Sequence, residues 1–153
     1  MIKIRKAIMN DLKNIQSLNN SLFEWDSQFD KTLCAGWSFG DMGTKYFSEM
    51  IKSEFVYVAE NKNKVVGYLA GSFNNKKSYS SEKYAELDNM YVLQEFRKHG
   101  IGKLLFEEFN KQCQQKGIKS IRVTASAKNS GAIAFYKKNG FEEFDITLRK
   151  SEE

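Results

Sequence analysis

The sequence predicts an α/β fold in which a mixed sheet is flanked by helices. Two patterns indicate it. In the first half, the strand-like segments 55–59 and 65–73 flank a polar turn, as in an antiparallel hairpin. In the second half, apolar spacing changes from strand to helix and back along 84–125, which predicts a right-handed crossover between parallel strands. The sheet should therefore contain both antiparallel and parallel neighbours.

The first half is expected to begin with a short strand, because apolar and basic residues alternate over 2–5. A helix that Asn10 or Asp11 can cap follows, and a second helix starts near Asp41. Between these helices, segment 23–40 mixes aromatic and acidic residues without a clear period, so no regular element is predicted there.

The second half is expected to continue from a strand at 84–92 into a helix that begins at Ile101. Gly117 is a natural end for this helix, because glycine adopts the left-handed conformation at little cost. The remaining elements predicted are a strand at 119–125, a helix at 129–139, and one or two closing strands within 141–148.

Length and composition restrict the class of protein. With 153 residues, 41% of them hydrophobic and 14% aromatic, the chain should form one folded domain over 1–153. The net charge of +5 suits an anionic partner, but the basic residues are scattered and form no recognisable motif, so no specific nucleic acid is expected. Cys34 and Cys113 have the spacing of neither a disulfide framework nor a metal site, so no metal is expected.

The start of the chain and its hydropathy suggest a compartment. No apolar run approaches the ~18 residues of a membrane span, and the first residues alternate in polarity, unlike a signal peptide. These features predict a cytoplasmic protein without a membrane partner.

A glycine-rich basic turn lies between the strand that ends at Val92 and the helix that follows. A helix N-terminus presents unpaired N–H groups, and Gly100 and Gly102 would let a pyrophosphate approach them. The dinucleotide-binding pattern fails because Leu105 stands where it needs a third glycine. A glycine turn with an ordinary basic cap is the alternative, but its place between strand and helix favours phosphate binding. Positive charge is supplied by Arg97, Lys98 and Lys103.

Two motifs together resemble the GCN5-related N-acetyltransferase (GNAT) family. The first is R-x-x-G-x-G, from Arg97 to Gly102, after a strand ending Met90-Tyr91-Val92. The second, similar to N-x-x-A-x-x-F-Y-x-x-x-G-F, runs from Asn129 to Phe141. Many members have Pro-Glu after the strand, where this chain has Gln94-Glu95.

The resemblance implies a GNAT fold, with a mixed, mostly antiparallel sheet of six to seven strands, splayed at the centre and flanked by about four helices. It also implies direct transfer of an acetyl group from acetyl-CoA to a primary amine in a ternary complex, and it is compatible with a homodimer. A non-catalytic acyl-CoA-binding regulatory module is the alternative function. The cofactor-binding residues it implies are Met90, Tyr91, Val92, Arg97, Lys98, His99, Gly100, Ile101, Gly102, Lys103, Asn129 and Tyr136.

Three residues are the candidates for proton transfer. Glu86 and Asp88, eleven and nine positions before Arg97, resemble two base positions that different branches of the family use. Both would share a face with Met90 if the strand were regular, whereas a bulge would shift them. Tyr136 resembles the family's general acid, although packing on its helix is the alternative. The single histidine, His99, lies in the phosphate turn and is not expected to be the base.

The acceptor site is expected to involve segment 23–41. Its aromatic and acidic side chains would suit a cation with an apolar body, although core packing of the aromatics is an equal alternative. A polyamine, an aminoglycoside-like amine, a peptide N-terminus and a lysine side chain all remain candidate acceptors. The side chains concerned are Glu24, Trp25, Asp26, Phe29, Asp30, Trp37, Phe39 and Asp41.

Overall fold

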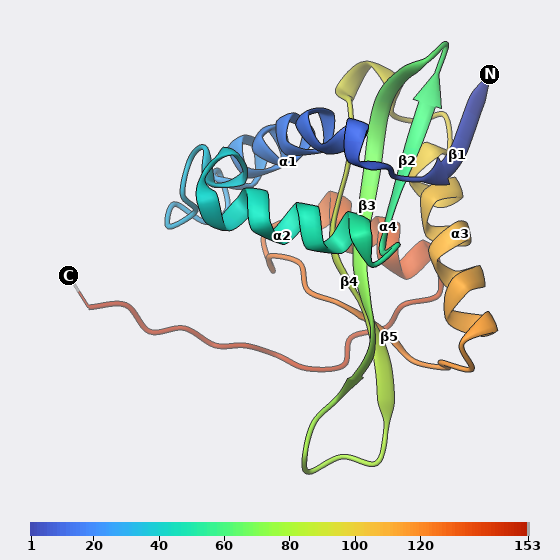
Figure 1. The fold of residues 1–153 in the computed structure, drawn as a ribbon. Coiled ribbons are helices and arrows are strands. Elements are labelled where there is room, and N and C mark those ends of the chain that lie inside the picture. Colours follow the sequence, from blue (N-terminus) through green and yellow to red (C-terminus); the bar gives the residue numbers. More distant parts are fainter. Residues whose placement is uncertain (153) are drawn as a thin grey trace.

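A five-stranded mixed sheet forms the centre of the molecule in the computed structural model, which describes residues 1–152 (Figure 1). The strands lie in chain order, β1 to β5, and each neighbouring pair is antiparallel except β4 and β5, which are parallel. The predicted hairpin and the predicted parallel crossover are therefore confirmed. The strands are β1 (Ile2–Lys6), β2 (Val56–Asn61), β3 (Lys64–Lys76), β4 (Lys83–Val92) and β5 (Ile121–Val123).

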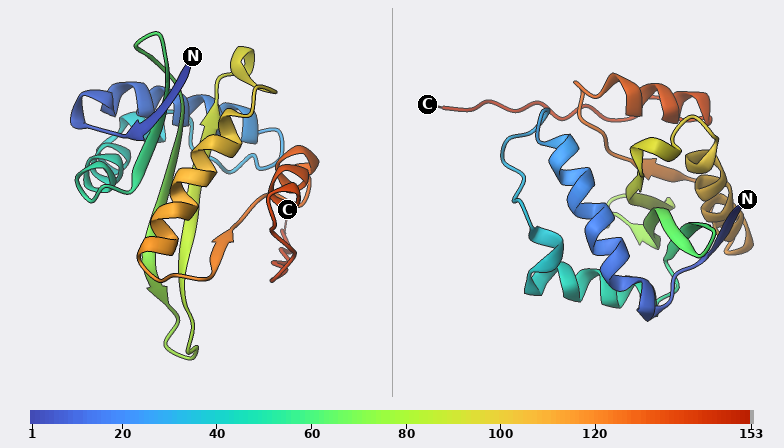
Figure 2. Two further views of the ribbon diagram at one scale, coloured as in Figure 1. Left: turned by 90° about the vertical axis from the view of Figure 1, so that its right-hand side faces the viewer. Right: turned by 90° about the horizontal axis from the view of Figure 1, so that it is seen from above.

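Helices cover both faces of this sheet, as Figure 1 and the view from above in Figure 2 show. α1 and α2 pack on one face, while α3 packs on the other, with α4 beside its N-terminal end. None of the helices in the described part of the chain is long and apolar enough to cross a membrane. The helices are α1 (Leu12–Asp26), α2 (Asp41–Lys52), α3 (Ile101–Gln115) and α4 (Ser130–Lys138), with short 3-10 turns η1 (Met9–Asp11), η2 (Trp37–Phe39) and η3 (Gln94–Phe96).

Each face of the sheet has its own apolar core, because successive strand residues point to opposite faces. On β3, Leu69 packs with Phe109 of α3, whereas its neighbour Tyr68 packs with Ile15 of α1. Gly71 permits the close approach of α3, since a Cβ there would lie 2.3 Å from the Phe109 ring. The helical spacing seen in the sequence is thus explained by burial against the sheet.

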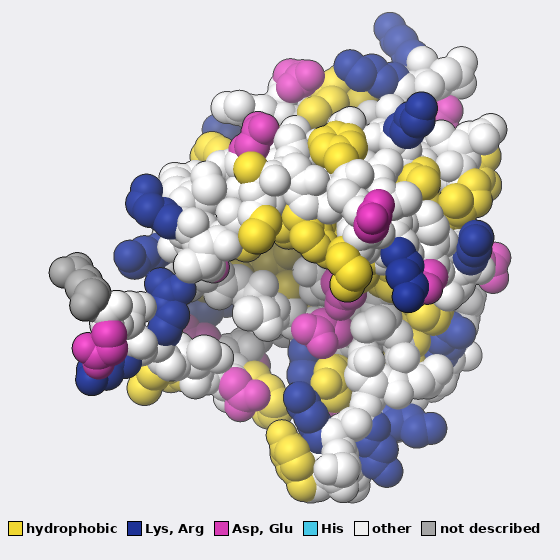
Figure 3. All heavy atoms as spheres, turned by 60° about the vertical axis from the view of Figure 1, so that its left-hand side comes forward, with side chains coloured by type: hydrophobic (Ala, Val, Ile, Leu, Met, Phe, Trp, Pro, Cys, Tyr) yellow, Lys and Arg dark blue, Asp and Glu magenta, His cyan; other side chains and the backbone are white. Residues whose placement is uncertain are grey.

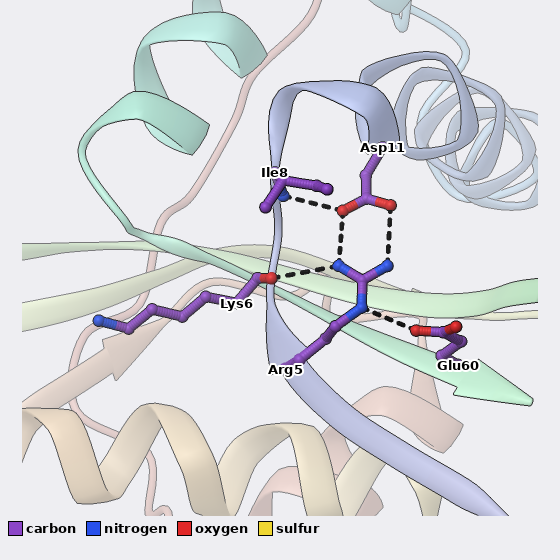
Figure 4. Close-up of polar contacts among 5 residues, drawn as sticks. All are labelled: Arg5, Lys6, Ile8, Asp11 and Glu60. Carbon is purple, nitrogen blue, oxygen red and sulfur yellow. Dashed lines mark hydrogen bonds and ion pairs between the residues drawn. The ribbon is translucent and has the colours of Figure 1, made fainter. Parts of the chain in front are cut away.

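A cluster of polar contacts fixes the start of the chain (Figure 4). Arg5 of β1 donates two hydrogen bonds to Asp11, at 2.8 and 3.0 Å, and a third to Glu60 of β2, at 2.7 Å. Asp11 also accepts from the backbone N–H of Ile8. Burial alone would raise the pKa of Asp11, but the Arg5 and Ile8 hydrogen bonds and the Arg5 charge together hold it below its usual value. The cluster therefore ties β1 to the entry of α1.

A β-bulge interrupts β4 at Asp88. Ala70 of β3 pairs with Asn89, but the next residue, Gly71, pairs with Leu87, so Asp88 is the extra residue. Beyond this bulge β4 and β5 also part, since their parallel pairing ends at Leu87 and Val123. Residues 88–92 therefore have no strand partner on the β5 side within the described chain, whereas the splay at the centre of the sheet stays a prediction.

The predicted closing strands at 141–148 are wrong. Residues 141–152 form no strand, and the described part of the chain contains five strands instead of the six to seven expected. The segment instead runs away from the body as an extended arm (Figure 1). Phe144, Ile146 and Leu148 alternate along it and are 70%, 80% and 90% exposed. Alternation correctly indicates an extended chain, but a strand also needs hydrogen bonds to a partner strand, and this arm pairs with none of the strands among the described residues.

Candidate active site

The N-terminus of α3 is open to a ligand. Gly100 precedes the helix in a left-handed conformation (φ 76°), and the first helical hydrogen bond runs from Leu104 N–H to Gly100 C=O. The N–H groups of 101–103 therefore precede the helical ladder, and Gly100 has no side chain to cap them. A Cβ at Gly100 would meet nothing within 4 Å. The turn thus has both the N–H groups and the free space that a pyrophosphate needs.

Gly102 has a packing role as well. A Cβ at this position would lie 3.3 Å from the ring of Phe135 on α4. The missing side chain therefore lets α4 approach the start of α3. This contact places α4, the helix that carries Tyr136, against the start of α3.

The Arg97 guanidinium already has partners within the protein. It lies 5.4 Å from the Trp25 ring of α1 and 5.0 Å from the Tyr91 ring of β4. Its Nε donates to the Val92 carbonyl at 2.9 Å. Phosphate binding by Arg97 stays a prediction, but its observed contacts hold the last turn of α1 against β4.

The backbone edge of β4 after the bulge is the second open feature. Residues 88–92 lie beyond the last β5 pair, next to the start of α3 in the chain. Such an edge offers N–H and C=O groups to an extended ligand, as another strand would. The predicted pantetheine-binding residues Met90, Tyr91 and Val92 all lie on it.

The bulge also decides which way the two candidate bases point. Leu87 and Met90 both belong to the core on the α3 side, so Met90 does not share a face with the carboxylates, as expected for a bulged rather than a regular strand. Asp88 instead reaches α2, where its Oδ2 accepts a hydrogen bond from Tyr46 at 2.8 Å. Glu86 lies between Ala85 and Leu87, two members of the α3-side core, and so faces the α1–α2 side as well.

Asp88 has an environment suited to a base. Its carboxylate is accessible to solvent on one side, but surrounding protein raises its pKa by desolvation. The Tyr46 hydrogen bond opposes this effect, whereas the nearby charge of Glu86 adds to it. A carboxyl group with a raised pKa is the better proton acceptor once ionised.

Tyr136 lies half-buried between the rings of Phe135 and Phe141, at centroid distances of 5.3 and 5.4 Å. Burial raises its pKa to about 12, and the charge of Asp26 adds to the effect. The phenol therefore keeps its proton at neutral pH and can donate it. At the start of the same helix, Asn129 Oδ1 accepts from the N–H of Ala132 at 3.1 Å and so caps α4.

Segment 23–41 divides between core and surface. Trp37 stacks on Phe23, with centroids 5.8 Å apart, and also contacts Phe47, so it is a packing residue. Trp25 and Phe39 remain exposed. The surface on this side of the molecule is hollowed, and acidic and hydrophobic side chains gather around the hollow (Figure 3).

Two residues near Asp88 were missed from the sequence. Asn89 Nδ2 donates to Tyr46 Oη at 3.0 Å, and Tyr46 in turn donates to Asp88. Tyr46 belongs to the apolar side of an amphipathic helix, so its spacing resembles that of any packing residue. Within residues 1–152, no group of three or more His, Cys, Asp or Glu side chains is placed to hold a metal ion.

Comparison with known proteins identifies this arrangement. The model of the acetyltransferase (GNAT) family matches residues 17–141. The chain belongs to this family. That confirms the resemblance found in the two motifs, and the match covers all the candidate site residues.

Relatives of this GNAT protein include two from archaea. A spermidine N(1)-acetyltransferase of Thermoplasma acidophilum is 28% identical over 94% of this chain and 90% of its own length. An uncharacterized N-acetyltransferase of Methanocaldococcus jannaschii is 30% identical over 66% of this chain, which spans only 46% of that protein. This chain thus covers about half of some of its relatives.

Solved structures share the fold over almost the whole chain. A mutant of the BH1408 protein of Bacillus halodurans superposes with a TM-score of 0.84 at 18% identity, covering 98% of this chain and 99% of that one. The aminoglycoside N-acetyltransferase AAC(6')-Iy, in complex with CoA, gives 0.76 at 17% identity, covering 99% and 95%. At these identities the likeness shows the fold.

Proposed function

We propose that this GNAT protein transfers an acetyl group from acetyl-CoA to a primary amine, by direct attack in a ternary complex. The observation that carries the proposal is the combination of an uncapped α3 N-terminus at Gly100 with the unpaired edge of β4 that leads to it. A pyrophosphate fits the first, and an extended pantetheine arm fits the second. The family match and the CoA complex of a structural neighbour support acetyl-CoA as the donor.

The groups that would contact acetyl-CoA come from three elements. Backbone N–H groups of 100–103 would hold the phosphates, and Lys98, His99 and Lys103 would face them from the same turn. Backbone groups of 90–92 would align the pantetheine and polarise the thioester carbonyl. Asn129 keeps its amide nitrogen free for the same arm, since only its oxygen is used in capping α4.

The protonated amine loses two protons overall and the departing sulfur gains one, so one proton is released to solvent. An alkylamine with a pKa of about 10.4 is mostly protonated at neutral pH, so one proton must leave before the nitrogen attacks and the second leaves as the N–C bond forms. Glu86 or Asp88, directly or through water, would take the proton that the nitrogen loses as the N–C bond forms. As the C–S bond breaks, Tyr136 would act as the acid by donating a hydrogen bond to the sulfur as negative charge develops there, and the thiolate takes up one of the two protons that the amine released. The products are the acetylated amine and CoA.

The acceptor is proposed to be a cationic amine. Carboxylates line the side of β4 that faces α2, and Asp26, whose pKa is raised by burial, lies near Tyr136 at the end of α1. A cation would be attracted to these groups although the protein as a whole is basic. A relative named for spermidine and a neighbour named for aminoglycosides support this class.

An acceptor screen tests the function. The protein is incubated with acetyl-CoA and a panel of polyamines, aminoglycosides, peptides with free N-termini and lysine derivatives, and released thiol is measured. Amine-dependent CoA release above the rate in buffer is expected. Tight acetyl-CoA binding without release on any amine would contradict catalysis and favour a non-catalytic acyl-CoA-binding module.

We further propose that residues 1–153 act as one acetyltransferase domain and that two copies associate. Large apolar side chains along the C-terminal arm are exposed, and β5 is an edge strand of the sheet. Exposed apolar groups on an extended segment favour pairing with another strand edge. A homodimer would cover both features.

A further inference from the structure

Asp88 is the last member of a chain of hydrogen bonds that begins inside the core. Asn19 Nδ2 of α1 donates to Tyr68 Oη of β3 at 2.9 Å, and Tyr68 Oη donates to Asn89 Oδ1. Asn89 Nδ2 donates to Tyr46 Oη at 3.0 Å, and Tyr46 Oη donates to Asp88 Oδ2 at 2.8 Å. Side chains from four elements, α1, β3, β4 and α2, are therefore linked in series to one carboxylate.

The direction of every link follows from the charge at its end. An ionised carboxylate only accepts, so Tyr46 must donate to Asp88 and can only accept from Asn89. Asn89 then presents its nitrogen to Tyr46 and its oxygen to Tyr68, which must donate in turn. Asn19 is left to donate its nitrogen, and its Oδ1, fully buried, has no hydrogen-bond partner within the described residues. The unpaired oxygen is the far end of a chain whose polarity suits an ionised Asp88.

The hydroxyl that touches Asp88 is held in place by packing. The Tyr46 ring lies 4.8 Å from that of Phe47 and 5.6 Å from that of Trp37. Two neighbouring aromatic rings leave the phenol few alternative orientations. Glu86 has no comparable support, since no side chain of residues 1–152 donates a hydrogen bond to it. Of the two candidate bases, Asp88 alone is oriented by the protein.

We propose that Tyr46 is a positioning residue that fixes Asp88 as the proton acceptor of the reaction. It directs Oδ2 toward itself and leaves Oδ1 free for the amine. The proposal rests on the proposed acetyl transfer and deepens it, because it selects Asp88 over Glu86 as the base. The series of hydrogen bonds that begins at Asn19 explains why the Tyr46 hydroxyl donates its proton to Asp88 and to no other acceptor.

Removing the hydroxyl has a predictable effect on the titration of Asp88. The groups that face this carboxylate are Tyr46 from α2 and, on β4, Glu86 and Asn89. Donation from Tyr46 stabilises the ionised form, so its loss should raise the pKa of Asp88. A tyrosine that only packed against its neighbours would leave that pKa unchanged.

The first test compares Tyr46→Phe with the unsubstituted protein. We expect the carboxyl resonance of Asp88, followed by NMR, to titrate about one pH unit higher in Tyr46→Phe. The acid limb of kcat/KM should move by the same amount, with kcat at neutral pH about tenfold lower and KM for acetyl-CoA little changed. Tyr57→Phe is the matched control, because it removes a buried tyrosine hydroxyl that bonds Gln112 on the other face of the sheet. Tyr57→Phe should change neither the NMR titration of Asp88 nor the pH dependence of kcat/KM.

The second test separates the two carboxylates. Asp88→Asn keeps the shape of the side chain and should lower kcat about 100-fold or more. Glu86→Gln should lower it much less. An equal or larger loss in Glu86→Gln, or an Asp88 titration that is the same in Tyr46→Phe, would overturn the proposal. Failure of the proposed function would give a different result. The unsubstituted protein would then release no CoA with any amine, while the pKa of Asp88 would still be higher in Tyr46→Phe than in the unsubstituted protein.

Discussion

Tyr136→Phe is expected to lower kcat about 10–100-fold while KM for acetyl-CoA changes little. Burial holds the pKa of the Tyr136 phenol at about 12, whereas a thiol has a pKa of about 8.5. Complete proton transfer to the thiolate would therefore be uphill by about 5 kcal/mol. The phenol more favourably donates a hydrogen bond to the sulfur as negative charge develops there. A hydrogen bond to a charged partner is worth about 1.5–3 kcal/mol, which gives this range of rates.

The assay is steady-state thiol release with the amine found in the screen, from about pH 6 to 9. With a pKa of about 12, Tyr136 should contribute no alkaline limb in that interval. Its hydroxyl donates no hydrogen bond within the described chain, so the melting temperature should stay the same and serves as the folding control. An unchanged kcat with an unchanged KM would refute the acid role and leave Tyr136 as a packing residue.

Three further outcomes are expected. Gly100→Glu should weaken acetyl-CoA binding more than about 100-fold in calorimetry, because it places a carboxylate at the phosphates. Gly100→Asn is the control and should still bind acetyl-CoA, because asparagine tolerates the left-handed conformation. Equal binding by both variants would show that the phosphates do not bind at this turn. Asp11→Asn should reduce the free energy of unfolding by about 2–3 kcal/mol in urea at pH 7. The pKa of Asp11 is lowered in the folded protein, so this difference should shrink as the pH falls below about 4; a difference independent of pH would contradict the ion pair. Ile146→Lys, at an exposed site in the C-terminal arm, should lower the mass measured by light scattering from dimer to monomer; identical masses would argue against association through the arm.

The phosphate turn illustrates which features local sequence is sufficient to predict. A left-handed Gly100, a helix starting at Ile101 and an Asn129 cap on α4 all depend on residues within a few positions of each other. Backbone sterics and local hydrogen bonds decide such features, so a motif can predict them. The mixed sheet and the crossover were predictable from the periodicity of apolar residues, and the family from two motifs at a characteristic distance along the chain.

The C-terminal arm and Arg97 mark where local pattern was insufficient. Alternation over 141–148 predicted an extended chain correctly, but pairing depends on a partner strand elsewhere. Phosphate binding by Arg97 stays a prediction from its place in the motif, but the sequence did not indicate that its guanidinium lies over the ring of Trp25, a residue far away in sequence. Contacts between distant segments have no signature in either segment alone.

The sequence by itself determined that this chain carries a glycine-rich basic turn before a helix, two carboxylates in one strand and a tyrosine in the helix at 129–139. Only the tertiary structure decided which way the carboxylates point and which side chains they contact. A single extra residue at Asp88 changes the facing of every residue after it, and this depends on the register of β4 against β3. Tyr46 meets Asp88 across 42 positions because α2 packs on that face of the sheet. Register and packing are properties of the assembled sheet, and therefore the choice between Glu86 and Asp88 became possible only there.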